Sequence, residues 1–399
     1  MNLDNLKTTD GIDVAGKRVL YRADLNVPTK DGSITDATRL ERVVPGLQAL
    51  AGRGAKVIVL SHFGRPKNGP DRENSLAPVA AALGSLLNRH VPLAGDCIGE
   101  HARTIVDALK PGDICVLENT RFHKGEEKND PVFTAELARL GDIFVNDAFS
   151  AAHRAHASTE GLTHRLPSFA GPLMMEEINA LKSALEVPKR PTAAVVGGAK
   201  VSTKIPILTN LVAKVDKLII GGGMANTFLQ AEGVEVGRSL AEPDFHATAR
   251  QIMANARSRG CEIVLPADAV IAREFKAGAP SEIVDLNNVP ADAMILDIGP
   301  VSIAAMTDHL RQSRTLLWNG PMGAFEISPF GEGTFTLARE AAKLTREGQL
   351  LSIAGGGDTV AALNAAGVAG DFSYISTAGG AFLEWLEGKE LPGVAALAR

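Results

Sequence analysis

The stretch Ser352–Leu363, SIAGGGDTVAAL, decides the fold class because an apolar run passes through three glycines into a helical pattern. The preceding residues LLSIA predict a buried strand, and the following TVAALNAAG predicts a helix. A glycine turn between strand and helix is where an α/β protein commonly binds phosphate. Asp358 places a negative charge in this turn, and a phosphate site alone does not explain that charge.

The same order of strand, turn and helix recurs along the chain. Apolar runs such as RVLYRADLN, KVIVLSHFG and DIFVNDAFS alternate with amphipathic stretches such as RLERVVPGLQALAG and FTLAREAAKLTREG. Nearly continuous apolar runs are typical of strands buried on both faces. Strand–helix alternation therefore predicts an α/β fold of mostly parallel sheets with helices on both faces.

The chain length of 399 residues and the number of strands favour two domains over one. The break is predicted in residues 171–191, where GPLMMEEINALKSALE indicates a long helix and the prolines of VPKRP end it. We predict a first domain over 1–171, a connecting helix over 172–190 and a second domain over 191–384.

Composition excludes several classes of protein. Charged residues make up 22%, and the net charge of −5 offers no basic surface for nucleic acid or anionic membrane. No apolar run reaches the ~18 residues that a membrane helix needs, and the first residues lack the pattern of a signal peptide. Three cysteines without a CxxC pair argue against a disulfide framework or a zinc site. We expect a cytoplasmic protein.

Polar and cationic residues follow the predicted strands of the first half. Ligands of an open parallel sheet bind beyond the carboxyl ends of its strands. Because arginine binds phosphate and carboxylate in a bidentate manner, this pattern indicates a site for a small polyanion. Solvated loop charge is the alternative for any single residue. The residues concerned are Asp24, Asn26, Arg39, His62, Arg65, Asn119, Arg121, Asp147, His153, Arg154 and His156.

Glycines follow the predicted strands of the second half, in VVGGAK, IIGGGMA and IAGGGDT. Such turns favour a nucleotide or another phosphorylated ligand, although tight packing of strand on helix alone can also require glycine. Lys200 and Lys204 follow the first turn, and Asn319 and Glu326 follow another strand. Neither GxxxxGK[ST] nor GxGxxG occurs, so a Walker-type site and a standard dinucleotide fingerprint are unsupported.

Nine motifs together resemble the phosphoglycerate kinase family, and they occur in that family's order from residue 22 to residue 388. The motifs are RADLNVP, SHFGRP, ENTRF, DAFSAAHRAHAS, GGAKVSTK, GGGMANTF, WNGPMGAFE, GGGDT and STAGGAFLEWLEG. The resemblance implies an ATP:3-phospho-D-glycerate phosphotransferase of glycolysis that uses Mg²⁺. It also implies two Rossmann-like domains joined by a hinge, a C-terminal segment of about 385–399 that returns to the first domain, and a monomer.

The resemblance also implies the roles of individual residues. Contacts to 3-phosphoglycerate or 1,3-bisphosphoglycerate are expected from Asp24, Asn26, Arg39, His62, Arg65, Arg121 and Arg154. Contacts to ADP or ATP are expected from Lys204, Asn319, Glu326, Gly356, Gly357, Asp358 and Thr359. Arg39 and Lys200, with the helix start at Gly379 and Gly380, are expected to neutralise the transferring phosphoryl group. Asp358 is the expected ligand of Mg²⁺, since a hard cation prefers carboxylate oxygen.

The sequence departs from the family pattern at two places. Ser150 and Ala151 stand where Gly-Thr is frequent, and Tyr21 stands where an aliphatic residue is usual. Neither departure removes an expected contact, and both concern the packing of the loops.

Two other classes of protein remain as alternatives. One is a two-domain NAD(P)-dependent dehydrogenase, which would share the doubly wound fold but lacks its fingerprint here. The other is a non-catalytic protein that binds a polyanion on the same fold.

A phosphoglycerate kinase needs no general base for phosphoryl transfer, because the attacking carboxylate of 3-phosphoglycerate is already ionised. It needs alignment and compensation of charge, and closure of two domains that excludes water. The helix near 171–186 and the STAGG segment are the expected hinges.

Overall fold

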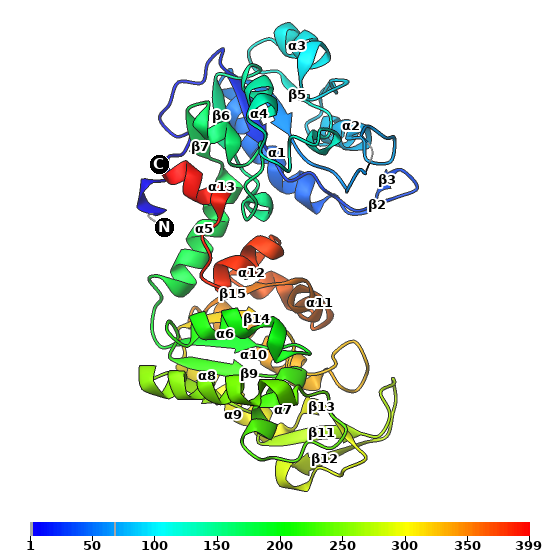
Figure 1. Ribbon diagram of the computed structural model, residues 1–399, viewed down its shortest axis with the longest axis vertical. Helices are drawn as coiled ribbons and strands as arrows, with labels where there is room; N and C mark the ends of the chain where they lie inside the picture. The colour runs from blue at the N-terminus through cyan, green and yellow to red at the C-terminus, as the bar shows by residue number, and fades with distance from the viewer. Residues whose placement is uncertain (1–2, 68) are drawn as a thin grey trace. The chain divides into compact units, whose positions relative to one another are not determined.

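The computed structural model describes residues 3–67 and 69–399. These residues divide into two compact units. Unit 1 comprises residues up to Ile178 together with Glu390–Arg399, and unit 2 comprises Asn179–Lys389. Each unit is built around its own parallel sheet with helices against both faces (Figure 1).

Unit 1 contains a five-stranded sheet in which every pair of neighbours is parallel, in the order β5-β4-β1-β6-β7. Val19 lies opposite Val57 on one side and Ile143 on the other, which fixes the register of the central strands. The strands are β1 Arg18–Arg22, β4 Lys56–Leu60, β5 Ile114–Val116, β6 Ile143–Asn146 and β7 Ser168–Ala170, and the helices are α1 Thr38–Gly52, α2 Ala77–Leu86, α3 Gly99–Ala108 and α4 Pro131–Ala138. A short hairpin joins β2 Thr29–Lys30 to β3 Ser33–Ile34.

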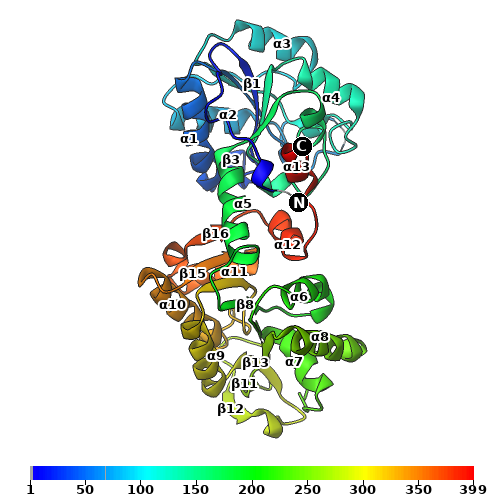
Figure 2. The same cartoon turned by 90° about the vertical axis from the view of Figure 1, so that its left-hand side faces the viewer.

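Alternate residues of β1 supply the two hydrophobic cores of unit 1. Val19 and Tyr21 pack in the core that α1 and α2 cover, whereas Leu20 packs in the core that α3 and α4 cover. Figure 2 shows these two helix pairs on opposite sides of β1. Both faces of the strand are therefore buried, which explains why its three central residues, Val19 to Tyr21, are apolar or aromatic.

Unit 2 contains a six-stranded parallel sheet in the order β10-β9-β8-β14-β15-β16. Its strands are β8 Thr192–Val196, β9 Lys217–Ile220, β10 Glu262–Val264, β14 Thr315–Asn319, β15 Leu351–Gly355 and β16 Tyr374–Ser376. Its helices are α6 Ile205–Leu211, α7 Gly222–Ala231, α8 His246–Arg259, α9 Pro300–Gln312, α10 Glu332–Arg346, α11 Gly357–Ala365 and α12 Gly380–Leu386. Figure 2 shows α9 and α10 on one side of the strands and α7 and α8 on the other.

A separate antiparallel sheet of three strands belongs to unit 2, in the order β12-β11-β13. Its strands are β11 Asp268–Ala272, β12 Ser281–Asp285 and β13 Met294–Ile298. The run EIVLPADAV thus holds the parallel strand β10 and the first three residues of the antiparallel strand β11. An apolar run predicts a strand but does not say in which direction its partner runs.

The helix α5, Pro172–Leu185, contains the boundary between the two units, at Ile178 and Asn179. The chain returns to unit 1 at its C-terminus, where α13, Pro392–Ala395, lies near β7 (Figure 1). The amide of Gly393 donates to the carbonyl of Ala152 over 2.8 Å. Among the described residues, no helix combines the length and the apolar character that crossing a membrane requires.

Candidate functional site

Both parallel sheets have a point at which the strand order reverses. In unit 1 the reversal lies between β1 and β6, and in unit 2 it lies between β8 and β14. The loops that leave such neighbouring strands diverge to opposite faces, and the space between them is where open α/β sheets bind ligands. The residues that follow these strands are therefore the candidate ligand-binding residues of each unit.

The strand ends of unit 1 gather a cluster of positive and imidazole groups. Nη2 of Arg22, at the end of β1, lies 2.9 Å from Nδ1 of His62, which follows β4. Burial lowers the pKa of His62 well below its usual value, and the charges of Arg22, Arg121 and Arg154 lower it further. His62 is therefore neutral near pH 7. Since arginine can only donate, Nδ1 accepts and Nε2 carries the hydrogen, which leaves an N–H donor for a ligand.

Burial also lowers the pKa of His156, to about 4, together with the charges of Arg121 and Arg22. The same group of side chains therefore acts on both histidines. A cluster of cations that depresses histidine pKa values in this way has an excess of positive potential. An anionic ligand would relieve it.

Arg22 is a candidate site residue that the sequence analysis missed. Its side chain is 1% exposed, and its Nε donates to Oγ of Ser158 over 2.8 Å. Ser158 in turn donates through Oγ and its amide to the buried carboxylate of Glu126, at 2.5 and 3.1 Å. The charge of Glu126 therefore supports a buried guanidinium at the end of β1. The available signal was an arginine at the end of an otherwise apolar run.

Asp24, Asn26 and Arg39 form a second connected group. Nη1 of Arg39 lies 3.1 Å from Oδ2 of Asp24 and donates to the carbonyl of Asn26 over 2.8 Å. Oδ1 of Asn26 accepts from the amide of Gly64 over 2.9 Å, which ties the loop after β1 to the loop after β4. Arg39 is half-exposed, and its guanidinium is therefore held but still accessible.

Arg121 connects this group to the histidines. Its Nη1 donates to the carbonyl of Gly64 over 2.8 Å, and its Nε lies 3.2 Å from a carboxylate oxygen of Glu127. Burial lowers the pKa of Arg121, and the nearby charges of Arg154 and Arg65 lower it as well, against Glu127. The structure thus links the seven residues predicted to bind phosphoglycerate through hydrogen bonds, ion pairs and close charges.

The two departures from the family pattern have structural explanations. Oγ of Ser150 donates to Oδ2 of Asp24, and so this serine joins the candidate site. The hydroxyl of the buried Tyr21 donates to Asp147, whose Oδ1 accepts from the amide of Met174 in α5 over 3.0 Å. Burial raises the pKa of Asp147 to about 6.

The first two glycine turns of unit 2 owe their glycines to packing between loops. A Cβ on Gly197 would lie 1.9 Å from the carbonyl oxygen of Pro321, and one on Gly222 would lie 2.7 Å from that of Gly198. The packing explanation raised by the sequence therefore accounts for these two positions. The loops after β8, β9 and β14 contact one another at the carboxyl edge of the sheet.

The third glycine turn combines a packed glycine, Gly355, where a Cβ would lie 2.7 Å from the ring of Phe382, with an open position at Gly357. A Cβ on Gly357, the first residue of α11, would meet no atom within 4 Å, so space is open above it. Gly356 has φ of +97°, and a side chain there would also meet Nδ2 of Asn319 at 2.6 Å. This turn therefore exposes backbone at the start of a helix, where amide groups can bind an anion.

Lys204 and Asn319 lie beside this turn. Nζ of Lys204 donates to Oδ1 of Asn319, and Nδ2 of Asn319 donates to the carbonyl of Gly355 over 2.8 Å. Burial lowers the pKa of Lys204, and the charge of Asp358 opposes that shift. Oγ1 of Thr359 accepts from the amide of Gly320 over 2.8 Å, which joins α11 to the loop after β14.

The remaining predicted residues of unit 2 are exposed: Lys200, Glu326, Gly379 and Gly380. Lys200 lies close enough to Glu242 for its charge to help lower the pKa of that carboxyl. Gly379 has φ of +55° and is the N-cap residue of α12, which begins at Gly380. Within the part of the chain that the structure describes, Glu326 lies outside the hydrogen-bonded group of Lys204 and Asn319.

Two α/β units, one with a cationic strand edge and one with an open glycine turn, are typical of proteins that bind phosphorylated ligands. Comparisons with known proteins identify the family. The model of the family "Phosphoglycerate kinase" matches residues 9–389. The chain belongs to the phosphoglycerate kinase family.

The relatives support this assignment over the full length of the chain. A phosphoglycerate kinase of Chelativorans sp. (strain BNC1) is 63% identical over 395 residues, covering 99% of this chain and 98% of the relative. One of Rhizobium leguminosarum bv. trifolii (strain WSM2304) is 61% identical over 396 residues, with 99% of each chain covered. The solved structure of phosphoglycerate kinase from Coxiella burnetii has a TM-score of 0.93 at 44% identity, with 98% of each chain covered.

These findings confirm the predicted family, the α/β fold class and the phosphoglycerate kinase activity. The alternative of an NAD(P)-dependent dehydrogenase is therefore wrong.

Proposed function

We propose that the chain transfers a phosphoryl group reversibly between 1,3-bisphosphoglycerate and ADP, with unit 1 binding the phosphoglycerate and unit 2 binding the nucleotide. The observation that carries this division is the contrast between the two sheet edges. One presents a connected set of arginines and histidines, and the other presents an open helix start beside Lys204. The first suits a small, highly charged anion, and the second suits the phosphates of a nucleotide.

Phosphoglycerate binding is assigned to Asp24, Asn26, Arg39, His62, Arg65, Arg121 and Arg154. The neutral His62 offers an N–H donor, and the arginines offer charge-assisted hydrogen bonds to phosphate oxygens. We add Arg22 as the residue that positions His62, because its guanidinium fixes the tautomer of that ring.

Nucleotide binding is assigned to Lys204, Asn319, Glu326, Gly356, Gly357, Asp358 and Thr359. Asp358 is exposed in the first turn of α11, and an accessible carboxylate is a suitable ligand for Mg²⁺. Bound with the nucleotide, Mg²⁺ supplies neutralisation of phosphate charge. Asp358 would hold the ion directly or through water while the backbone of Gly356 and Gly357 meets phosphate oxygens.

Catalysis is assigned to Arg39, Lys200, Gly379 and Gly380. The carboxylate of 3-phosphoglycerate is a ready nucleophile near pH 7, so these residues need only align the reactants and stabilise charge on the transferring group. Arg39 already has its guanidinium held by Asp24 and Asn26, which reduces the reorganisation needed during the reaction.

Direct transfer requires the two ligands to come into line within bonding distance. We therefore infer that residues 1–171 and 191–384 act as domains that close on each other, with 172–190 and the STAGG segment as hinges and about 385–399 acting with the first domain. Closure also keeps water from hydrolysing the acyl phosphate. We place the enzyme in the cytoplasm as a monomer.

A coupled assay for ATP-dependent formation of 1,3-bisphosphoglycerate tests the proposal. It should show turnover that needs Mg²⁺, and X-ray scattering should show compaction only when both substrates are present. A chain that binds both ligands but shows no turnover would instead be a non-catalytic polyanion-binding protein. Turnover without compaction would contradict closure.

A further inference from the structure

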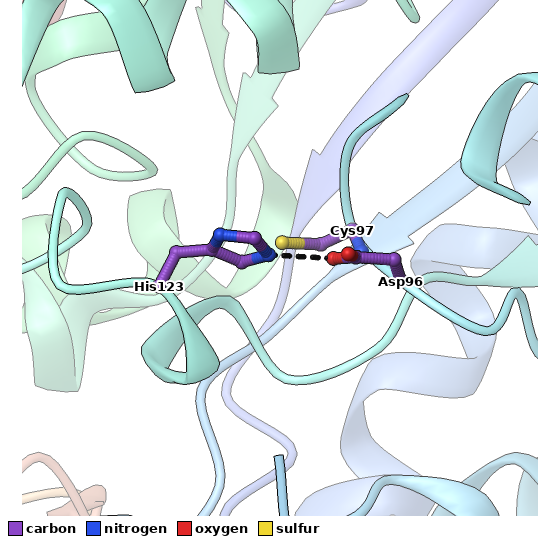
Figure 3. Close-up of side chains that lie close together, drawn as sticks. All are labelled: Asp96, Cys97 and His123. Carbon is purple, nitrogen blue, oxygen red and sulfur yellow. Dashed lines mark hydrogen bonds and ion pairs between the residues drawn. The ribbon is translucent and has the colours of Figure 1, made fainter. Parts of the chain in front are cut away.

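The loop before α3 and the turn after β5 bring together three side chains that the kinase reaction does not use. They are Asp96, Cys97 and His123, and one ligand atom from each lies within 4.8 Å of the others. Figure 3 shows the sulfur of Cys97 beside the hydrogen bond that joins His123 to Asp96. That bond joins Nε2 of His123 to Oδ1 of Asp96 over 2.6 Å.

We propose that Asp96, Cys97 and His123 form a binding site for a borderline-soft divalent cation such as Zn²⁺. A thiolate, an imidazole nitrogen and a carboxylate oxygen are three ligand types that Zn²⁺ accepts in tetrahedral sites, with water in the fourth position. Mg²⁺ prefers an all-oxygen shell, and the donor set therefore separates this site from the ion that accompanies the nucleotide.

The three side chains are held in place by the fold. Oδ1 of Asp96 also accepts from the amide of Cys97 over 2.6 Å. The ring of His123 stacks on Phe133 of α4, with 5.2 Å between ring centres and 25° between planes. Rigid donors that already converge lose little conformational freedom when a cation binds.

The negative charge of Asp96 favours a cation at this point, whereas the burial of Cys97 opposes the thiolate that would bind it. The thiol of Cys97 is fully buried; burial raises its pKa, and the neighbouring charge of Asp96 raises it further. An inaccessible, protonated thiol is unsuited to nucleophilic chemistry. A bound cation would stabilise the thiolate, and its charge would offset the repulsion between sulfur and carboxylate.

A route to solvent exists through the other two ligands. The side chains of Asp96 and His123 are 36% and 30% exposed, so a cation can approach from that side without opening the core around Cys97. On binding, the proton of Sγ passes to solvent. The proton between Nε2 and the carboxylate is also released, or moves to Nδ1 of the same ring.

This site was not predicted from the sequence, because the chain lacks a CxxC pair. The absence of a CxxC pair argues against a zinc site built from paired cysteines, but not against a site with a single cysteine ligand. Here Asp96 and Cys97 are adjacent, and the third donor comes from 26 residues further along the chain. The fold alone brings His123 to them, and the inference is independent of the roles assigned under the proposed function.

Titration of the full-length, metal-free chain with Co²⁺ tests the site, because a cobalt–thiolate bond has an intense charge-transfer absorption. We expect roughly one Co²⁺ per chain with that band, displaced by Zn²⁺ and not by excess Mg²⁺. Cys97→Ser should abolish the band. Cys115→Ser is the matched control, since Cys115 is equally buried on β5, and it should leave the band unchanged.

Asp96→Asn provides a second variant that keeps a hydrogen-bond acceptor at the same place. We expect it to weaken Co²⁺ binding by about 10-fold or more through loss of the charged ligand. Absence of the band in the wild-type chain, or its survival in Cys97→Ser, would overturn the proposal and leave a hydrogen-bonded cluster with a purely structural role.

Discussion

The carboxyl edges of the two parallel sheets share a strand order but differ in their chemistry. In both units the second and third strands of the sheet lie to one side of the first, and the fourth and fifth lie to the other, followed in unit 2 by a sixth. In unit 1 this edge carries arginines and histidines whose positive charges, together with burial, lower the pKa values of their neighbours. In unit 2 it carries glycine loops that pack together, with Lys204 and Asn319 beside an open helix start.

The difference shows how one topology can hold unlike ligands. Strand order determines where a ligand binds, whereas the residues just beyond the strands determine which ligand it is. Unit 1 holds its cations with buried carboxylates such as Glu126, and unit 2 uses exposed backbone amides that need no such partner. Loss of a buried charge such as Arg22 should therefore act mainly on stability, whereas loss of an accessible cation in unit 1 or of a residue at the open turn of unit 2 should act mainly on binding or catalysis.

Replacement of the buried Arg22 should have the largest effect. Arg22→Met would remove the positive charge that Ser158 links to the buried carboxylate of Glu126, and loss of one of two opposite buried charges should cost about 3 kcal/mol. Hydrogen exchange followed by mass spectrometry should show that loss in β1 and β4 and unchanged protection in β8 and β14.

The double variant Arg22→Met with Glu126→Gln serves as the control, since it removes both charges. It should recover part of the lost stability. Equal loss of protection in both units would contradict the assignment of this network to unit 1 alone.

Removal of a cation expected to neutralise the transferring phosphoryl group should have the next largest effect. Arg39→Ala and Lys200→Ala should each lower kcat by about 100-fold or more, because each deletes a preorganised cation near the transferring group. Steady-state kinetics at saturating substrates measures this, with Arg89→Ala and Lys217→Ala, which lie outside both candidate sites, as matched controls. Wild-type kcat in either variant would mean that its assigned role is wrong.

Substitution of one binding residue in each unit should show that the two sheet edges bind different ligands. Arg65→Ala should weaken 3-phosphoglycerate by roughly tenfold and leave MgADP unchanged, since it removes one charge-assisted hydrogen bond. Asp358→Asn should weaken MgADP by a similar factor, with much less effect on metal-free ADP. Isothermal calorimetry checks both, and equal effects of either variant on the two ligands would refute the division between units.

The smallest expected effect is a change in the pH dependence of stability. The folded pKa of Asp147, about 6, lies above its usual 3.8, so the folded state binds more protons between these values. Unit 1 should therefore lose stability as pH rises from 4 to 6, by roughly 1 kcal/mol per pH unit. Hydrogen exchange across that range measures it.

Asp147→Asn should flatten the slope in unit 1 only. Asp297→Asn is the matched control, because burial raises the pKa of Asp297 in unit 2 to about 7. That variant should flatten the slope in unit 2 only. A slope in unit 1 that persists in Asp147→Asn would assign it to other groups.

Much of the fold and site could be predicted because the signals were local. Unbroken apolar runs followed by glycine or arginine predicted the strands and their carboxyl ends, and the nine motifs predicted the residues that unit 1 links together. The strand β12 was missed because its residues are mostly exposed and carry no apolar pattern. Arg22 and the Asp96–Cys97–His123 cluster were missed because their partners are distant in sequence and only folding brings them together.

The central claim is that each sheet edge binds one ligand, and hydrogen exchange with each ligand alone tests it most directly. We predict that 3-phosphoglycerate protects residues 61–65, 119–123 and 150–156, while MgADP protects residues 197–204, 319–323 and 355–359. Protection of both sets by either ligand alone, or of the opposite set, would contradict the account.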